Sequence, residues 1–509
     1  MTEAARRWRR EHFRALFDPC GVVVAGASTH PGKFGFVALH NILAAGYRGR
    51  VFATNREAAA VLGVAAVATI DELPAREVDL AVVCTPAAVN EGLLRACAAK
   101  GIKAAYVASA GYGEAGADGA VAQRRLTALA AELDLLVVGP NGQGVLSTPS
   151  ALCAQIVAPH PPAGRIGIAS QSGNVVSSFA NYARHHGVGV SRAVSVGNAA
   201  AVGVVDFLDF YAGDPETAVG LAYLEGVVDG RAVAEGLRAV VERLPVVLVK
   251  GGATAAGARA AASHTGSLAT DDRVFDGAVR QTGAVRAASI EEAYDLAATF
   301  ATQPLPRGGR VAVVTTAGGW GVMASDAINR ERGLELAPVP DDLMAALDAE
   351  LPDRWSRGNP VDLAGGETRD TLPEVLGLVA RHPSVDAVVL LGTGIQANQA
   401  RFEREGAFFP DHGLGRIVDY HERQDRRFVT VAAELSREVD KPILAATELA
   451  VTDRENAAVA GCRDAGVLCY ASADRAVTAL AALRRHARWR EARGLGPTGR
   501  RLEAGHDSP

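Results

Sequence analysis

Short apolar runs rich in β-branched residues alternate with Ala/Leu-rich stretches of helical periodicity along almost the whole chain. The runs are continuously apolar, and do not alternate between apolar and polar residues. This is typical of parallel strands that are covered by helices on both faces. A chain with this pattern is expected to build doubly wound α/β sheets.

Two Pro/Gly-rich breaks divide the pattern into three series. The first is APHPPAG (158–164) and the second is QPLPRGG (303–309). We therefore predict an α/β fold of three doubly wound Rossmann-like or flavodoxin-like domains with mainly parallel sheets. The predicted boundaries are 1–145, 146–303 and 304–494, followed by a flexible tail at 495–509.

The composition argues against several classes of protein. A net charge of −5 over 509 residues gives no basic surface for nucleic acid. No run of 18 apolar residues is present to cross a membrane, and the Arg-rich start lacks the apolar core of a secretory signal. The six cysteines form no C-x-x-C pair, so neither a zinc site nor a disulfide framework is indicated. We expect a cytoplasmic protein with no metal of its own.

The first apolar run, GVVVAGA (21–27), enters a turn that contains Gly26, Ala27 and Ser28. Exposed N–H groups and the positive end of the helix dipole suit an anion at such a helix start. The turn is neither G-x-G-x-x-G nor a P-loop. It therefore indicates a nucleotide or CoA site, with a purely structural turn as the alternative.

The second apolar run ends at Thr54-Asn55-Arg56. A dehydrogenase would place an acid here to hold the ribose hydroxyls, and none is present, which disfavours an NAD enzyme. Arg56 and Lys33 suit a phosphate-bearing ribose better, and CoA has one. The charges therefore favour CoA at the first domain.

Two later turns also join an apolar run to a helix. Ser170-Gln171-Ser172-Gly173 offers two hydroxyls and a glycine, which could cradle a phosphate. In the third series Gly318, Gly319 and Gly321 would let a ligand approach the backbone closely. Serine N-capping and a tight strand–helix turn are the structural alternatives.

One histidine, His264, lies within a segment of small residues at 253–267. Such a segment cannot dock itself through burial, so we expect it to be mobile. A histidine there could act as a nucleophile that carries a phosphoryl group, with a carboxylate orienting its other ring nitrogen. A plain surface or turn histidine is the alternative.

Together these motifs resemble those of the NDP-forming acyl-CoA synthetases, which are related to succinyl-CoA synthetase. The matching pieces occur in the family's order and cover roughly residues 12–490. They are FRALFDPCGVVVAGAST, DLAVVCTPA, YVASAGYGEAG, GPNGQG, IASQSG, VSVGN, YLEG, ARAAASHTGSLA, VVTTAGGWGV, GNPVDL and GVLCYASADRAVTAL.

The resemblance implies roles for individual residues. His264 would be the phosphorylated histidine, and Glu225 of Tyr-Leu-Glu-Gly the acid that orients it. The CoA side would comprise Gly26, Ala27, Ser28, Asn55, Pro86, Ser109, Ala110 and Asn141, and the charge argument above adds Lys33 and Arg56. Two phosphate-facing helix starts would comprise Ser170, Gln171, Ser172 and Gly173, and Gly318, Gly319 and Gly321.

The resemblance also implies an activity, that of the α-type subunit of an ADP-forming acid–thiol ligase. Acid, CoA and ATP would give acyl-CoA, ADP and phosphate through an acyl phosphate and a phosphohistidine. The three domains account for the whole length, so an ATP-grasp domain that binds ATP or ADP with Mg²⁺ is expected on a separate β-type chain. We therefore expect a hetero-oligomer that acts on a small carboxylic acid or its acyl-CoA. The acyl group, the direction of flux and the choice between ADP and GDP stay open.

Two positions depart from the family pattern. Gly142 stands where the family usually has cysteine, and Trp320 where its glycine-rich turn carries proline. These departures favour the alternative hypothesis of a non-catalytic, CoA-binding regulatory module. The intact set of His264, Glu225 and the Ser170–Gly173 turn favours the enzyme.

Overall fold

The computed structural model describes residues 8–157, 159–227, 229–254, 256–257, 259, 271–365, 370–451 and 453–496. The chain forms two compact units. Unit 1 comprises residues 1–184 and 189–293, and unit 2 comprises residues 185–188 and 294–509. His264 lies outside the described residues, and so do positions 497–509 of the predicted tail.

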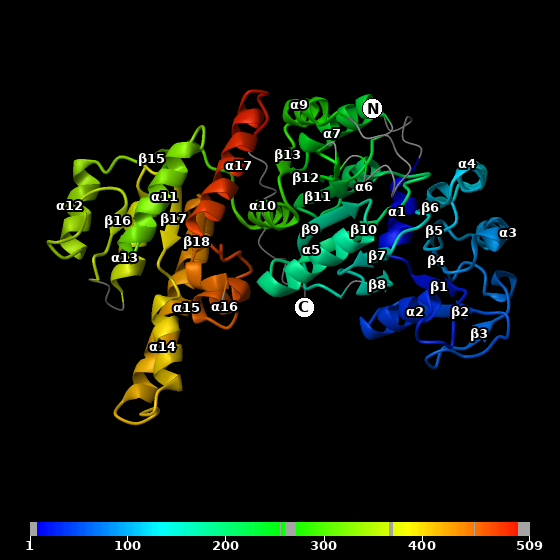
Figure 1. Cartoon of the computed structure of the whole chain (residues 1–509), viewed down its shortest axis with the longest axis horizontal. Helices are drawn as coiled ribbons and strands as arrows, with labels where there is room; N and C mark the ends of the chain where they lie inside the picture. The colour runs from blue at the N-terminus through cyan, green and yellow to red at the C-terminus, as the bar shows by residue number, and fades with distance from the viewer. Residues whose placement is uncertain are drawn as a thin grey trace, which may run out of the picture. The chain divides into compact units, whose positions relative to one another are not determined.

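Six parallel strands form the first sheet of unit 1: β1 (Gly21–Ala25), β2 (Arg50–Thr54), β3 (Ala66–Val67), β4 (Leu80–Val83), β5 (Ala104–Val107) and β6 (Leu136–Val138). Their order is β3-β2-β1-β4-β5-β6, as in dinucleotide-binding folds (Figure 1). Every residue of β1, β4, β5 and β6 is buried, because these apolar runs are covered on both faces. The order reverses between β1 and β4, so the loops that follow these two strands meet at one edge.

The helices of this part are α1 (Arg10–Phe17), α2 (Phe34–Ala44), α3 (Ala87–Ala99) and α4 (Ala117–Glu132), with short 3-10 turns at Ile70–Glu72 and Gly113–Ala115. Helix α2 packs very close to the turn after β1. A Cβ on Gly35 would lie 2.1 Å from the Gly26 carbonyl oxygen, so only glycine permits this approach.

The second sheet of unit 1 has seven strands: β7 (Gly144–Ser147), β8 (Leu152–Gln155), β9 (Ala163–Ser170), β10 (Val190–Ser195), β11 (Val219–Leu224), β12 (Val246–Lys250) and β13 (Val285–Ala287). Their order is β13-β12-β11-β9-β10-β7-β8. Five are parallel, and β7 and β8 join β10 as an antiparallel hairpin. The order of the parallel strands reverses between β9 and β11, so the loops after these strands share an edge.

The helices of this part are α5 (Gly173–His186), α6 (Val204–Tyr211), α7 (Gly230–Val241) and α9 (Asp272–Thr282). Helix α10 (Ile290–Thr302) begins in unit 1, but most of it belongs to unit 2. Asp229 begins α7, because its carboxylate accepts the Ala232 N–H at 2.9 Å.

Helix α1 joins the two sheets of unit 1. Phe13 and Phe17 stack on Phe210 of α6 with ring centroids 5.0 and 5.5 Å apart. Nearby, the buried Arg192 of β10 pairs with Asp214 at 3.2 Å and also with Asp18, which follows α1. The aromatic stack and the buried guanidinium fix the second sheet against the N-terminal helix.

Unit 2 contains one sheet of five parallel strands: β14 (Arg310–Thr315), β15 (Glu335–Leu336), β16 (Val361–Asp362), β17 (Ala387–Leu391) and β18 (Ile443–Ala446). Four of them lie in the order β15-β14-β17-β18, and β16 pairs with β14. The α/β fold with three mainly parallel sheets is thus as predicted. The exact boundaries at 145 and 303 stay predictions, and β7 already belongs to the second sheet.

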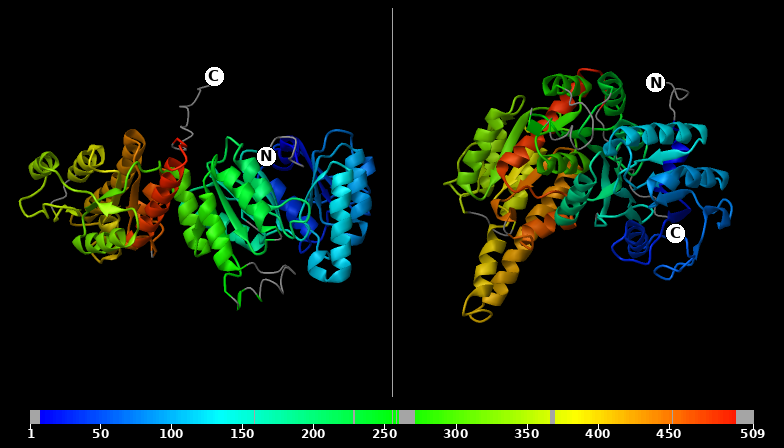
Figure 2. Two further views of the ribbon diagram at one scale, coloured as in Figure 1. Left: turned by 90° about the horizontal axis from the view of Figure 1, so that it is seen from above. Right: turned by 45° about the vertical axis from the view of Figure 1, so that its right-hand side comes forward.

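The helices of unit 2 are α11 (Gly318–Arg330), α12 (Asp341–Glu350), α13 (Thr371–Arg381), α14 (Ile395–Glu405), α15 (Leu414–Val439), α16 (Ala457–Asp464) and α17 (Ala473–Glu491), with a 3-10 turn at Glu448–Val451. Figure 2 shows α14 and the start of α15 running side by side as a hairpin that projects from this sheet. Further along α15, Phe428 and Leu435 enter the buried core. In the described part of the chain, no helix is both long and apolar enough to cross a membrane.

Candidate active site

The turn after β1 closes the first sheet at the point where its strand order reverses. Gly26 has a left-handed φ of 83°, and the N–H groups of Gly26 and Ala27 both donate to the Thr54 carbonyl. The Ser28 hydroxyl accepts the His30 N–H at 3.0 Å, and Pro86 begins α3 at the end of the neighbouring strand. The structure therefore brings the predicted CoA residues of β1 and β4 to one edge.

The basic residues and the asparagine predicted for CoA differ in their surroundings. Lys33 and Arg56 are exposed, so both are accessible to a phosphate. The Asn55 side chain is engaged locally, because its oxygen accepts the Ala59 N–H at 2.9 Å and its nitrogen donates to the Ala59 carbonyl at 2.7 Å. Asn55 shapes its own loop in this way.

A buried asparagine supports the predicted Ser109–Ala110 turn. The Asn90 amide nitrogen donates to the hydroxyls of Ser109 and Tyr112, both at 2.9 Å. Its oxygen accepts from the Thr85 hydroxyl at 2.7 Å. Asn90 thus ties the loop after β4 to the loop after β5. Sequence reasoning missed it, because it is an ordinary helical position in α3.

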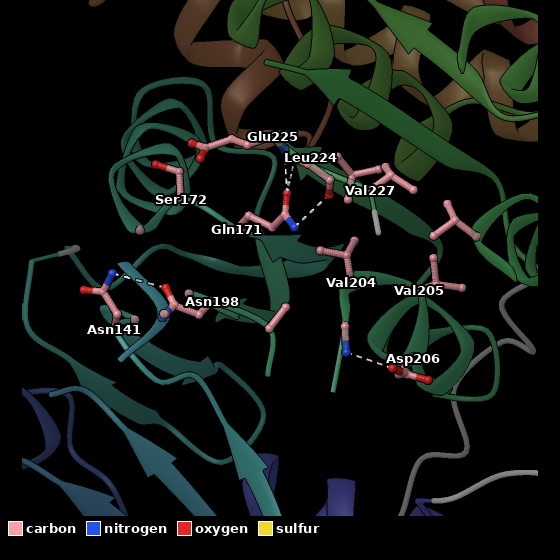
Figure 3. A pocket seen from close by; sticks show the side chains of 18 of the residues that line it. Asn141, Gln171, Ser172, Asn198, Val204, Val205, Asp206, Leu224, Glu225 and Val227 are labelled. Carbon is pink, nitrogen blue, oxygen red and sulfur yellow. Dashed lines mark hydrogen bonds between the residues drawn. The ribbon is translucent and has the colours of Figure 1, made fainter. Parts of the chain in front are cut away.

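A cavity of about 1300 Å³ opens in unit 1 between the first sheet and the second (Figure 3). It brings together six of the predicted residues from both sides: Ala110, Asn141, Gln171, Ser172, Gly173 and Glu225. Figure 3 shows polar groups from Asn141 and Asn198 at one side and valines of α6 at the other. The predicted residues Gly26, Ala27, Ser28, Lys33, Asn55, Arg56, Pro86, Ser109 and Ser170 do not line it.

Gln171 holds the strand end that carries Glu225. Its side-chain oxygen accepts the N–H groups of Glu225 and Gly226 at 2.5 and 3.2 Å, and its nitrogen donates to the Gly226 carbonyl at 3.1 Å. Burial, together with the hydrogen-bonded Glu225 carboxylate, raises the pKa of Tyr223 to about 12. The structure thus places Glu225 beside the start of α5, as the parallel neighbours β9 and β11 require.

The turn before α5 is stabilised by the hydroxyl of Ser170. Ser170 is fully buried, and its hydroxyl donates to the Ser172 carbonyl at 2.7 Å and accepts the Ser172 N–H at 3.0 Å. Gln143 covers the next residue, since a Cβ on Gly173 would lie 2.2 Å from the Gln143 Cγ. Gln143 also donates to the Asn174 side chain at 3.1 Å.

A polar bridge links the two sides of the cavity. Asn198 donates to Glu114 and Gln123 at 2.5 and 2.9 Å, and accepts from Asn141 at 3.3 Å. Burial raises the pKa of Glu114, but hydrogen bonds from Asn198 and the Gly111 N–H outweigh it and hold the pKa below its ordinary value. Of these residues only Asn141 was singled out from the sequence; Asn198, Glu114 and Gln123 were not, because only the pairing of the two sides brings them together.

The second predicted helix start lies in unit 2. The Thr315 hydroxyl donates to the Ala317 carbonyl at 2.9 Å and accepts its N–H at 3.0 Å, and α11 follows from Gly318. A carboxylate already faces this start, since a Cβ on Gly318 would lie 2.6 Å from the Asp362 Oδ2. Within the described residues, no group of three or more His, Cys, Asp or Glu side chains could hold a metal ion.

Known proteins are similar to this chain in both sequence and fold. Three domain families match: a CoA binding domain over residues 21–148, a succinyl-CoA ligase like flavodoxin domain over 163–300 and a ligase-CoA domain over 311–395. The α subunit of the ADP-forming acetate–CoA ligase I of Pyrococcus furiosus is 32% identical over 482 residues, which are 94% of this chain and 98% of that protein. The chain belongs to the ADP-forming acetate–CoA ligase family.

Two more members of this family are informative. The ADP-forming acetate–CoA ligase I of Archaeoglobus fulgidus is 36% identical over 378 residues, which are 74% of this chain but only 54% of that protein. The acetyl-coenzyme A synthetase 1 of Candidatus Korarchaeum cryptofilum, solved with phosphate and ADP, matches with a TM-score of 0.80 and 29% identity. That match covers 96% of this chain and 99% of the solved chain.

Proposed function

We propose that this chain is the α-type subunit of an NDP-forming acyl-CoA synthetase, with the overall reaction acid + CoA + ATP = acyl-CoA + ADP + phosphate. The observation that carries the proposal is the cavity, which is lined at once by Asn141 of the first sheet's side and by Ser172, Gly173 and Glu225 of the second. The cavity thus lies between a CoA-binding domain, the start of α5, which suits an anion, and the carboxylate of Glu225.

In the direction of acyl-CoA cleavage, a phosphate oxygen attacks the thioester carbonyl. The carbon–sulfur bond breaks, CoA leaves as the thiol after taking up a proton, and an acyl phosphate remains. His264 then attacks phosphorus, so that a nitrogen–phosphorus bond forms and the carboxylate leaves. Glu225 orients the imidazole and stabilises the positive charge that develops on the ring.

The phosphohistidine would pass its phosphoryl group to ADP on another chain. We assign Mg²⁺ to that partner together with the nucleotide, because Mg²⁺ neutralises the phosphates of a bound nucleotide during phosphoryl transfer. The separate α subunit of Pyrococcus furiosus has nearly the same length, whereas the matched 378 residues make up only 54% of the longer Archaeoglobus fulgidus ligase. Both facts support a β-type partner with an ATP-grasp domain in a hetero-oligomer.

Phosphorylation tests this proposal. The chain is mixed with its β-type partner and [γ-³²P]ATP, and the label on the α chain is mapped. We expect label on His264 that is labile in acid and stable in alkali. Absence of label, or equal label on a His264→Ala variant, would refute the mechanism. CoA binding without turnover of acid, CoA and ATP would instead support a regulatory module.

A further inference from the structure

We propose that Tyr106 is a positioning residue of this site, whose buried hydroxyl holds the turn from Asn141 to Gly144 in the cavity wall. The kinetic part of the proposal rests on the function proposed above. The structural part rests on contacts around one hydroxyl group and on the glycine that faces it.

The Tyr106 hydroxyl joins the first sheet to two strands of the second. Tyr106 lies on β5 and is fully buried. Its hydroxyl donates to the Ser195 carbonyl at the end of β10 at 2.6 Å and accepts the Gly144 N–H at the start of β7 at 2.7 Å. Both functions of the hydroxyl are satisfied, so its loss leaves a buried N–H and a buried carbonyl without their partner.

The Tyr106 hydroxyl leaves no room for a side chain at position 142. A Cβ at position 142 would lie 2.1 Å from the Tyr106 oxygen and 2.7 Å from the Ser195 carbonyl oxygen. The φ of Gly142 is not in the left-handed region, so the backbone conformation alone does not demand glycine. The tyrosine therefore accounts for the absence of a side chain at position 142.

The held turn faces the proposed chemistry. Asn141, Gly142 and Gln143 all line the cavity. The Gln143 N–H donates to the Ser195 hydroxyl at 3.1 Å, and its side chain covers Gly173 at the start of α5. Release of the turn would move Gln143 away from the helix start that faces phosphate in the proposed reaction.

The test compares Tyr106→Phe with a matched control, Tyr211→Phe. Tyr211 is also fully buried and donates one hydrogen bond at 2.8 Å, but its acceptor is the Ile168 carbonyl, which lies outside the turn from Asn141 to Gly144. Hydrogen–deuterium exchange of the full chain follows the peptide that contains residues 139–147. We expect exchange there to become about tenfold faster in Tyr106→Phe and to stay at the wild-type rate in Tyr211→Phe.

Steady-state kinetics with the partner chain supply the functional readout. In the acyl-CoA-cleaving direction we expect the KM for phosphate to rise about fivefold or more in Tyr106→Phe, with the KM for ADP unchanged, since ADP binds to the partner. Wild-type exchange in Tyr106→Phe, or the same kinetic change in both variants, would overturn the proposal. If the wild-type complex does not turn over acid, CoA and ATP, the proposed function is refuted. Hydrogen–deuterium exchange of residues 139–147 would then decide by itself whether Tyr106 holds the turn.

Discussion

Replacement of Gln171 by leucine should disturb the candidate active site through the strand end that carries its acid. The side chain makes three hydrogen bonds, to the N–H groups of Glu225 and Gly226 and to the Gly226 carbonyl. Leucine fills a similar volume but offers no polar atom. The end of β11 then loses its support while the surrounding packing is kept.

The magnitude follows from the number of bonds. A typical buried hydrogen bond stabilises a protein by about 0.5–1.5 kcal/mol, so three bonds give about 1.5–4.5 kcal/mol. Gln171 is only partly buried, and water can replace part of this loss. We therefore expect unit 1 to lose about 2–3 kcal/mol of unfolding free energy. A displaced Glu225 carboxylate should slow phosphorylation of His264 by about 10²-fold, the usual effect of a misplaced catalytic group.

Unit 1 can be followed by itself, because Trp8 is its one tryptophan and Trp320, Trp355 and Trp489 belong to unit 2. In a background with phenylalanine at those three positions, urea unfolding is monitored through Trp8 emission. The matched control is Gln303→Leu, since Gln303 accepts from the Ser436 hydroxyl at 3.1 Å and the Ile443 N–H at 3.0 Å within unit 2. The reasoning is refuted if Gln171→Leu costs less than about 0.5 kcal/mol, or phosphorylates as fast as the control.

Three further predictions concern single side chains. Glu225→Gln should leave CoA affinity unchanged and slow phosphorylation of His264 by about 10²–10⁴-fold in a rapid-quench assay, and a wild-type rate would remove the carboxylate from the chemistry. Arg56→Gln and Lys33→Met should weaken CoA binding but not dephospho-CoA binding in calorimetry, and parallel losses for the two ligands would exclude a contact to the extra phosphate. Burial raises the pKa of Asp425 from 3.8 to about 6 in the folded chain, so its stabilising effect is full below pH 3.8 and is lost as the pH rises through about 6. In Asp425→Asn, the decrease in the unfolding free energy of unit 2 with rising pH should be smaller by about 2–3 kcal/mol. If the melting temperatures of the two proteins depend identically on pH, the assignment to Asp425 is contradicted.

Much of the fold could be predicted because its strands are local apolar runs. The same logic brings Glu225 beside Gln171, since the ends of parallel neighbours meet at one edge of a sheet. Strands β7 and β8 were missed, because each has only four residues, and β7 crosses the predicted boundary at 145. Their pairing with β10 depends on the second sheet already being formed.

Side chains that act between the two sheets of unit 1 could not be found in this way. Asn198 bonds Glu114 and Asn141 across the cavity, and the sequence does not reveal which loops will face each other. Asn55 shows the reverse situation. Its position at a strand end favours a ligand contact, but the structure engages both ends of its amide within the loop 55–59. The half-buried Trp320 has no structural explanation here.

The glycine-containing turns before α5 and α11 are stabilised by the same pattern of hydrogen bonds, but they face different groups. Ser170 and Thr315 each close the turn through their own hydroxyl, and Gln171 and Thr316 each donate to a glycine carbonyl at the neighbouring strand end at 3.1 Å. The strand register makes Thr393 of unit 2 the counterpart of Glu225, because Tyr223 pairs with Ser170 and Leu391 with Thr315.

The closed turn is therefore a property of the strand–helix junction, and it does not by itself indicate a phosphate site. In unit 1 the start of α5 faces Gln143 and the held carboxylate of Glu225, and it opens into the cavity. In unit 2 the start of α11 is next to the Asp362 carboxylate, which repels an anion unless a cation or a proton neutralises it. The two helix starts should therefore contribute unequally to phosphate binding, with the greater part from α5.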